Sequence, residues 1–149
     1  MIIHLGVMDV PYSNPAETKP GGGRRSGTQT TGDVATWLEE KYEVIAHYAE
    51  YDMDNITREI GNAYAGSLET FMQRGVMPKA PLAPAMGAIQ RNFRQFLTEE
   101  KIATMGVSGV PTAAAIAGVN HRKKAKKGAR RPSFIDTGLY QKSFLAWHN

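Results

Sequence analysis

The chain has 149 residues, 42% of them hydrophobic, which is enough for one domain with a single core. It has no cysteine, which excludes disulfides and thiolate metal sites, and no run of 18 apolar residues, so we expect no membrane partner. Its 18 Lys and Arg exceed its 14 Asp and Glu only because of one basic segment near the C-terminus.

The first predicted element is a strand in "MIIHLGVMDVPY", which is rich in β-branched and aliphatic residues and ends at Pro11. Ile3, Leu5 and Val7 alternate along it and share one face, and the other face is apolar as well. A strand with two apolar faces requires cover on both sides.

Residues 13–32, "SNPAETKPGGGRRSGTQTTG", contain five glycines and two prolines without apolar periodicity, which predicts an extended arm. We therefore expect a strand and arm at 1–32 and a core domain at 33–149. The arm is expected to lie on a partner surface such as a neighbouring copy, with crystal packing or fold-back onto its own domain as the alternative. The residues expected to make this inter-subunit contact are Ile3, Leu5, Val7, Arg24 and Arg25.

The first of three main helices is predicted in residues 30–52, with Asp33 as its N-cap. Glutamates 39, 40 and 43 face water in this helix, and an apolar stripe faces the core. The stripe consists of Val34, Trp37, Leu38, Ile45 and Tyr48.

A second helix is predicted in residues 55–75, capped by Asp52 or Asp54 and ending at Gly75. The small residues Gly61, Ala65 and Gly66 lower helix propensity, so we expect them to permit close contact with another helix. The first two helices are either separate or parts of one long, kinked helix. The core-facing stripe is expected to contain Ile56, Ile60, Ala63 or Tyr64, Leu68 and Phe71.

A third helix is predicted after a cluster of prolines, with Pro84 in its first turn. A short alanine-rich helix between Pro111 and Gly118 follows, and Thr137 is the expected cap of a helical turn. Residues 144–147 are predicted to be a last strand. The core positions of the third helix are Met86, Ile89, Phe93, Phe96 and Leu97.

These elements predict an α+β domain in which three main helices pack with a small sheet built from the terminal strands. A mainly helical bundle with detached arms is the alternative. The apolar C-terminal segment "RRPSFIDTGLYQKSFLAW" must pack either on the protein's own core or, by strand addition, on the sheet edge of a neighbour.

The sequence contains no recognisable motif for catalysis or metal binding. The four histidines stand far apart, and no pair has zinc-ligand spacing. Asp52 and Asp54 have calcium-loop spacing, but Thr57 and Ala63 occupy the positions that require glycine and glutamate. We therefore expect no cofactor, no metal and no enzymatic activity.

The strongest chemical signal is the predicted basic loop at 121–132. Seven of the ten residues from 122 to 131 are cationic, which leaves 11 Lys and Arg against 14 Asp and Glu elsewhere. The loop is predicted to contact DNA without reading its sequence, to dock on an acidic protein surface such as a neighbouring copy, or to be solvated. Its cations are Arg122, Lys123, Lys124, Lys126, Lys127, Arg130 and Arg131.

The stretch "DTGLYQKSF" resembles the neck and tail-completion proteins of tailed bacteriophages, many of which carry Thr-Gly-x-Leu-x-x-Ser-Ile after a basic, loop-like region. Thr137, Gly138 and Ser143 match this motif, whereas Tyr140 stands at the leucine position and Phe144 at the isoleucine position. "TQTTGDVATWLEEKYEVI" together with "RPSFIDTGLYQKSF" is also similar to small virion proteins of long-tailed phages.

The resemblance implies a structural protein of the virion that assembles in the host cytoplasm and forms an oligomeric ring at the neck or tail end. Its implied partners are copies of itself and adjoining connector, tube or sheath proteins, with non-specific contact to packaged DNA. Tail completion, tail terminator and head–tail connector are the implied roles. The alternative is a sequence-independent DNA-binding protein that uses residues 122–131.

Overall fold

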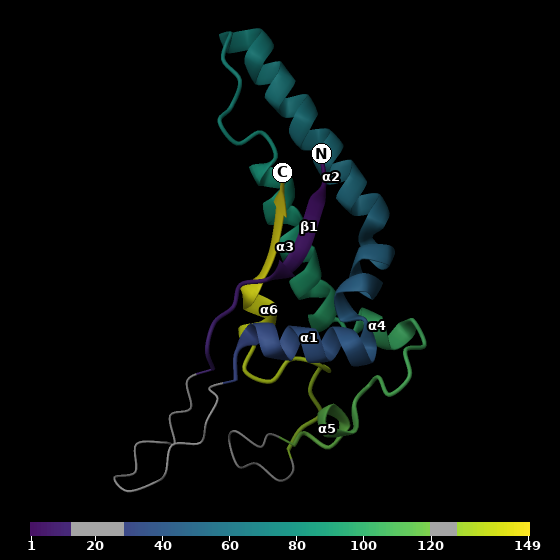
Figure 1. The fold of residues 1–149 in the computed structure, drawn as a ribbon. Coiled ribbons are helices and arrows are strands. Elements are labelled where there is room, and N and C mark those ends of the chain that lie inside the picture. The colour runs from purple at the N-terminus through teal and green to yellow at the C-terminus, as the bar shows by residue number, and fades with distance from the viewer. Residues whose placement is uncertain (13–28, 120–127) are drawn as a thin grey trace, which may run out of the picture.

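The computed structural model describes residues 1–12, 29–119 and 128–149 (Figure 1). The predicted α+β fold is confirmed, with three long helices and a two-stranded antiparallel sheet of the terminal strands. None of the described helices has the length and apolar character needed to cross a membrane. The elements are β1 (Ile3–Val7), α1 (Thr31–Tyr42), α2 (Val44–Arg74), α3 (Ala83–Thr98), α4 (Lys101–Thr104), α5 (Ala113–Ile116), α6 (Leu139–Ser143) and β2 (Phe144–His148).

Helix α1 begins with a capping box at Thr30. The Thr30 hydroxyl accepts a hydrogen bond from Asp33 N at 3.2 Å, and the Asp33 carboxylate accepts one from Thr30 N at 3.0 Å. The predicted N-cap, Asp33, is therefore wrong, because this residue occupies the third helical position and supports the cap from there. Trp37, predicted to face the core, is 59% exposed.

The chain turns sharply between α1 and α2 at Glu43, which has a left-handed backbone with φ 49°. The Glu39 carboxylate accepts hydrogen bonds from Ile45 N and Ala46 N at 2.8 and 3.0 Å, so it satisfies free amides in the first turn of α2. The prediction that a second helix begins at Asp52 or Asp54 is wrong. Both lie inside α2, because the helix starts a full two turns earlier.

Helix α2 has 31 residues and α3 has 16, so at 1.5 Å per residue α2 extends about 20 Å further. Its first half packs on α3, and its second half projects from the body of the molecule (Figure 1). Leu68 and Phe71, predicted to be core residues, are 51% and 48% exposed. Apart from the neighbouring backbone of α2 itself, no described atom lies within 4 Å of a β-carbon built on Gly61 or Gly66, so the close helix contact predicted there is not made within this part of the chain.

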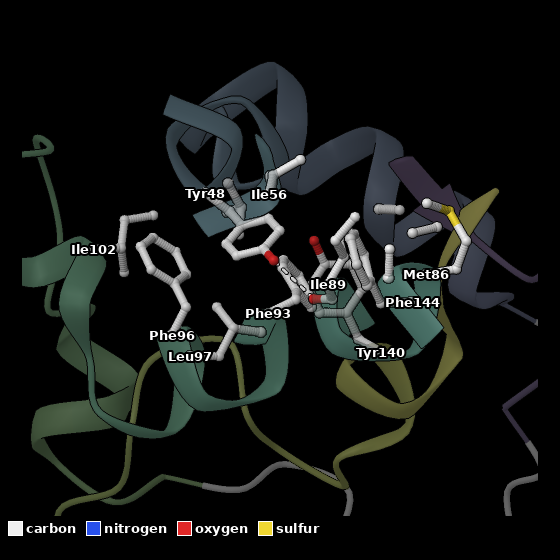
Figure 2. Close-up of a cluster of buried hydrophobic side chains, with 14 of the residues drawn as sticks. Tyr48, Ile56, Met86, Ile89, Phe93, Phe96, Leu97, Ile102, Tyr140 and Phe144 are labelled. Carbon is white, nitrogen blue, oxygen red and sulfur yellow. Dashed lines mark hydrogen bonds between the residues drawn. The ribbon is translucent and has the colours of Figure 1, made fainter. Parts of the chain in front are cut away.

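The core lies between α2, α3 and the C-terminal segment (Figure 2). Pro84 lies in the first turn of α3, as predicted. Phe93 of α3 stacks on Phe144 with ring centroids 3.8 Å apart and meets Tyr48 edge-on at 5.1 Å. Phe144 is fully buried and Tyr140 is 3% exposed, so the C-terminal segment packs on the protein's own core.

The sheet joins the two ends of the chain. Leu5 of β1 lies opposite Ala146 of β2 in the antiparallel register, and Ile3, Leu5 and Val7 pack against the core. On the outer face, His4 stacks on Trp147 with ring centroids 5.3 Å apart. Since the described sheet has two strands, each keeps one edge without a strand partner.

Candidate functional site

The basic loop is the first part of the candidate site, and the structure describes its base. Residues 120–127 lie outside the described part of the chain. The predicted partner or DNA contacts of five of the seven loop cations therefore concern residues outside the described part of the chain. The same holds for the predicted inter-subunit contacts of Arg24 and Arg25. The loop cations concerned are Arg122, Lys123, Lys124, Lys126 and Lys127.

The base of the loop is a close backbone contact beside α5. Gly128 N donates to Ala117 O at 3.3 Å, and Arg131 N donates to Ala115 O at 3.1 Å. Gly118 has φ 63°, and a β-carbon there would collide with the backbone of Gly128. The two ends of the loop are therefore held side by side.

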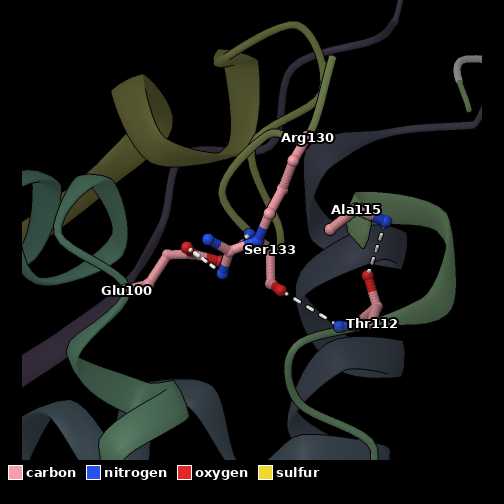
Figure 3. A network of polar contacts seen from close by, with 5 residues as sticks. All are labelled: Glu100, Thr112, Ala115, Arg130 and Ser133. Atoms are coloured by element: carbon pink, nitrogen blue, oxygen red, sulfur yellow. Dashed lines mark hydrogen bonds and ion pairs between the residues drawn. The ribbon is translucent and has the colours of Figure 1, made fainter. Parts of the chain in front are cut away.

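Arg130 is bound within the chain by a polar network (Figure 3). Its guanidinium lies 2.7 Å from Glu100 Oε2, while Glu100 Oε1 accepts a hydrogen bond from Ser133 N at 3.3 Å. The Ser133 hydroxyl in turn accepts one from Thr112 N at 3.1 Å, and Thr112 caps α5. The network ties the end of the loop to α4 and α5.

Arg131 is also bound within the chain. Its Nη1 donates to Ile135 O at 2.7 Å and its Nη2 to Val119 O at 3.2 Å, and Nη2 lies 3.9 Å from the carboxylate of Asp136. The two described arginines of the loop thus hold its base together. Their predicted contact with a partner or with DNA stays a prediction.

The second part of the site is a cavity of about 270 Å³, which we name the α1–α6 hollow. Trp37 and Leu38 of α1 form one wall, and Phe134 and Leu139 form another. Three residues of the phage-like motif line the hollow as well, namely Thr137, Gly138 and Tyr140. The other two do not reach it, because Phe144 is fully buried in the core and Ser143 is 6% exposed.

The wall of the hollow contains two buried donors without a hydrogen-bond partner among the described residues. These are the Tyr140 hydroxyl and Arg131 Nε. Burial raises the pKa of Tyr140, and the nearby charges of Glu39 and Tyr12 raise it further. An unpaired buried donor costs about 1–3 kcal/mol, so this wall is less well satisfied than the core.

The third part of the site is the free end of α2 and the turn after it, which we name the α2 knob. The sequence analysis did not predict this exposed surface. The apolar face of α2 continues past the end of α3, so α3 covers only the first part of that face. The prolines at 78, 81 and 84 were the available signal, since they delay the start of the next helix. The exposed residues of the knob are Leu68 (51%), Phe71 (48%), Met72 (84%), Val76 (68%) and Met77 (44%).

A polar cleft of about 250 Å³ between α2, α3 and α4 contains the buried carboxylate of Asp52. This carboxylate lies within 3.0 Å of the Tyr48 hydroxyl and accepts hydrogen bonds from Asn55 and Asn92 at 2.7 and 3.0 Å. The three partners make Asp52 a structural anchor. The described residues contain no group of three His, Cys, Asp or Glu side chains that could hold a metal ion.

No protein-family model, curated protein or solved structure matches this chain.

Proposed function

We propose that this chain is a non-enzymatic structural protein of a tailed-phage virion that assembles into a homo-oligomeric ring at the neck or tail end. The motif at Thr137, Gly138 and Ser143 supports this class of protein by resemblance. The structural observation that carries the proposal is the α2 knob, in which Met72 is 84% exposed and Val76 is 68% exposed.

Clustered exposure of this kind is unfavourable for an isolated soluble chain. Single exposed apolar residues are ordinary, whereas contiguous apolar patches mark interaction sites. The knob gathers five large apolar side chains on the end of one helix and the turn after it. Burial against another protein would recover about 25 cal/mol per Å² of apolar surface, and this gain favours assembly.

The mass of the purified protein, alone and mixed with its connector or tail tube, tests this proposal. We expect a closed oligomer of one size in at least one of these mixtures. A chain that remains monomeric alone and in every mixture contradicts the proposal.

Sequence-independent DNA binding is the second candidate function, and the base of the basic loop favours it. The contact between Gly118 and Gly128 holds both ends of a strongly cationic segment at one place on the surface. Each phosphate that the loop neutralises would release counterions, giving a salt slope of about −0.9 per contact on duplex DNA.

Replacing the cations at 122–127 by glutamine tests DNA binding without changing the base. If the loop binds DNA, retention is lost and its salt dependence becomes flat. Replacing Arg58 and Arg91, two exposed cations of α2 and α3 outside both the loop and the knob, is the control. Unchanged retention of DNA by the loop variant rejects this function.

A further inference from the structure

Helix α2 has a second contact face, on the side turned away from the core. The core side contains Ile56, Ala63 and Ser67, which are at most 9% exposed. On the other side, six positions are separated alternately by three and four residues, which is the spacing of the contact seam between two paired helices. We name this stripe the α2 seam. It consists of Arg58, Gly61, Ala65, Leu68, Met72 and Gly75, all of them exposed.

No described element covers the α2 seam. Leu68 is 51% exposed and Met72 is 84% exposed, and the space around a β-carbon built on Gly61 is open. The described residues that flank 13–28 and 120–127 lie beside α1 and α5, at the end of the molecule opposite to the free end of α2 (Figure 1). The sequence predicts a close helix contact on this face, and the described chain does not make it. The contact is therefore left for a partner outside the chain.

The seam has small residues toward one end and large ones toward the other. Gly61 and Ala65 leave room beside the helix, whereas Leu68 and Met72 project from it. An antiparallel copy of the same helix places Met72 against Gly61 and Leu68 against Ala65 at the same time. Each large side chain then meets a small residue, which lets the two helices interdigitate. The seam is thus complementary to itself, so it specifies a second copy of this chain as its partner.

The charges of the overlapping stretch, residues 58–75, agree with this register. Arg58 of one copy lies at the level of Gly75 of the other, where the free carbonyls of a helix C-terminus attract a cation. Glu59 lies at the level of Arg74, which has the opposite charge, and Glu69 lies at the level of an uncharged tyrosine. These are the four charged residues of the stretch, so none of them is level with a like charge.

We propose that the α2 seam pairs with the α2 seam of a second copy, antiparallel and related by a two-fold axis. Met72 and Leu68 are the inserted side chains, and Gly61 and Ala65 receive them. One contact of this kind closes a dimer, whereas a larger ring needs a second surface as well. The pair therefore does not rest on the proposed ring.

Disulfide cross-linking tests the register, because the chain has no cysteine of its own. One protein carries Gly61→Cys and another carries Met72→Cys, and we expect a disulfide between the two proteins when they are mixed. Either protein alone should cross-link much less, since the cysteines of its two copies would lie about 16 Å apart along the pair. A mixture of Gly61→Cys and Gln73→Cys is the matched control, because Gln73 is an exposed neighbour of Met72 on another side of the helix.

Two outcomes of the cross-linking overturn the antiparallel pair. Cross-linking of each protein alone that is as strong as in the mixture indicates a parallel pair, in which Gly61 meets Gly61. A mixed cross-link no stronger than that of the Gln73→Cys control indicates random collision, and the seam then belongs to a different partner.

A substitution in the seam tests its contribution to the affinity of the dimer. Gly61→Leu fills the space that receives Met72, so we expect the dissociation constant to rise by about tenfold or more. The folded chain tolerates this change, because the space is open and leucine favours a helix more than glycine does. Gly66→Leu is the matched control, since it makes the same change at an equally open glycine of α2 outside the seam, and it should leave the dissociation constant unchanged. Sedimentation over a range of concentrations measures both.

The masses from sedimentation also separate the pair from the ring. A wild-type chain that forms dimers and nothing larger in every mixture supports the pair and overturns the ring. Larger assemblies that are equally stable in Gly61→Leu and Gly66→Leu support the ring and overturn the pair. A wild-type chain that stays monomeric at every concentration and in every mixture overturns both.

Discussion

Two buried tyrosines show how differently two regions of this molecule are completed. The Tyr48 hydroxyl, in the core between α2 and α3, lies 2.7 Å from Ile89 O and 3.0 Å from the Asp52 carboxylate. The Tyr140 hydroxyl, in the wall of the α1–α6 hollow, has no partner among the described residues. Both side chains are at least 97% buried by their exposures of 0% and 3%. The difference shows that the polar groups of the core are satisfied within the described chain, whereas the Tyr140 hydroxyl in the hollow is not.

The largest expected effect is the loss of an aromatic ring from the core. Phe93→Ala removes a fully buried ring that contacts Tyr48, Tyr140 and Phe144, so it should lower the free energy of unfolding by about 3–5 kcal/mol. Urea unfolding followed by circular dichroism measures this change. Phe71→Ala is the matched control, because it also replaces a helical phenylalanine by alanine, but at a residue that is 48% exposed. Equal losses in the two variants would show that the knob is as well packed as the core.

The next largest effect on the free energy of unfolding is expected when the hydrogen-bonded hydroxyl of Tyr48 is removed. Tyr48→Phe leaves the buried carboxylate of Asp52 and the carbonyl of Ile89 without their shared donor, so we expect a loss of about 1–3 kcal/mol. The same urea measurement tests it. Asp52 keeps its two asparagine donors in this variant, which limits the loss. A variant as stable as the wild type would mean that this network does not stabilise the core.

The fold was predictable from the sequence where the signal lies within the element itself, such as a repeating apolar pattern or a proline at a helix start. Pro84 marked the start of α3, and alternation marked Ile3, Leu5 and Val7 on one face of β1. The start of α2 was not predictable in this way, because it depends on the left-handed Glu43 and on the Glu39 carboxylate reaching forward to cap it. The cap of α1 was mispredicted for another reason. The stretch "TTGD" contains three residues that can cap a helix, Thr30, Thr31 and Asp33, and their capping free energies are similar.

The candidate site was predictable only in part. The cationic run and the motif at Thr137 and Gly138 were visible as composition and spacing. The role of Arg130 in the base of the loop was not, because Glu100 is thirty residues away along the chain. The knob was missed for a different reason: an apolar stripe predicts a buried helix face, but only the length of the opposing helix decides how much of the stripe is covered.

The pH dependence of unfolding compares the two tyrosines under one condition. Burial raises the pKa of both Tyr48 and Tyr140, and the Asp52 charge adds to this for Tyr48. The ordinary tyrosine pKa is about 10, so above this pH the unfolded chain loses phenolic protons that the folded chain keeps. The stability from these groups is therefore complete below about pH 10 and falls as the pH rises further.

Urea midpoints measured from about pH 9 to pH 11 test this dependence. We expect the decline above pH 10 to be shallower in Tyr48→Phe and in Tyr140→Phe than in the wild type, since each variant lacks one ionisable phenol. Other groups that titrate there, such as Lys101, cancel in the comparison of variants. Identical slopes in all three proteins would contradict the burial of both hydroxyls.

The smallest expected effect is the most specific test of the comparison. Tyr140→Phe removes a hydroxyl that has no partner and keeps the buried ring, so below pH 9 we expect the free energy of unfolding to stay within about 0.5 kcal/mol of the wild type or to rise. Urea unfolding beside Tyr48→Phe provides the matched pair, because the same atom is deleted from both sites. A loss from Tyr140→Phe as large as that from Tyr48→Phe would show that the Tyr140 hydroxyl is bonded in the isolated chain. In that case the wall of the hollow would be as complete as the core.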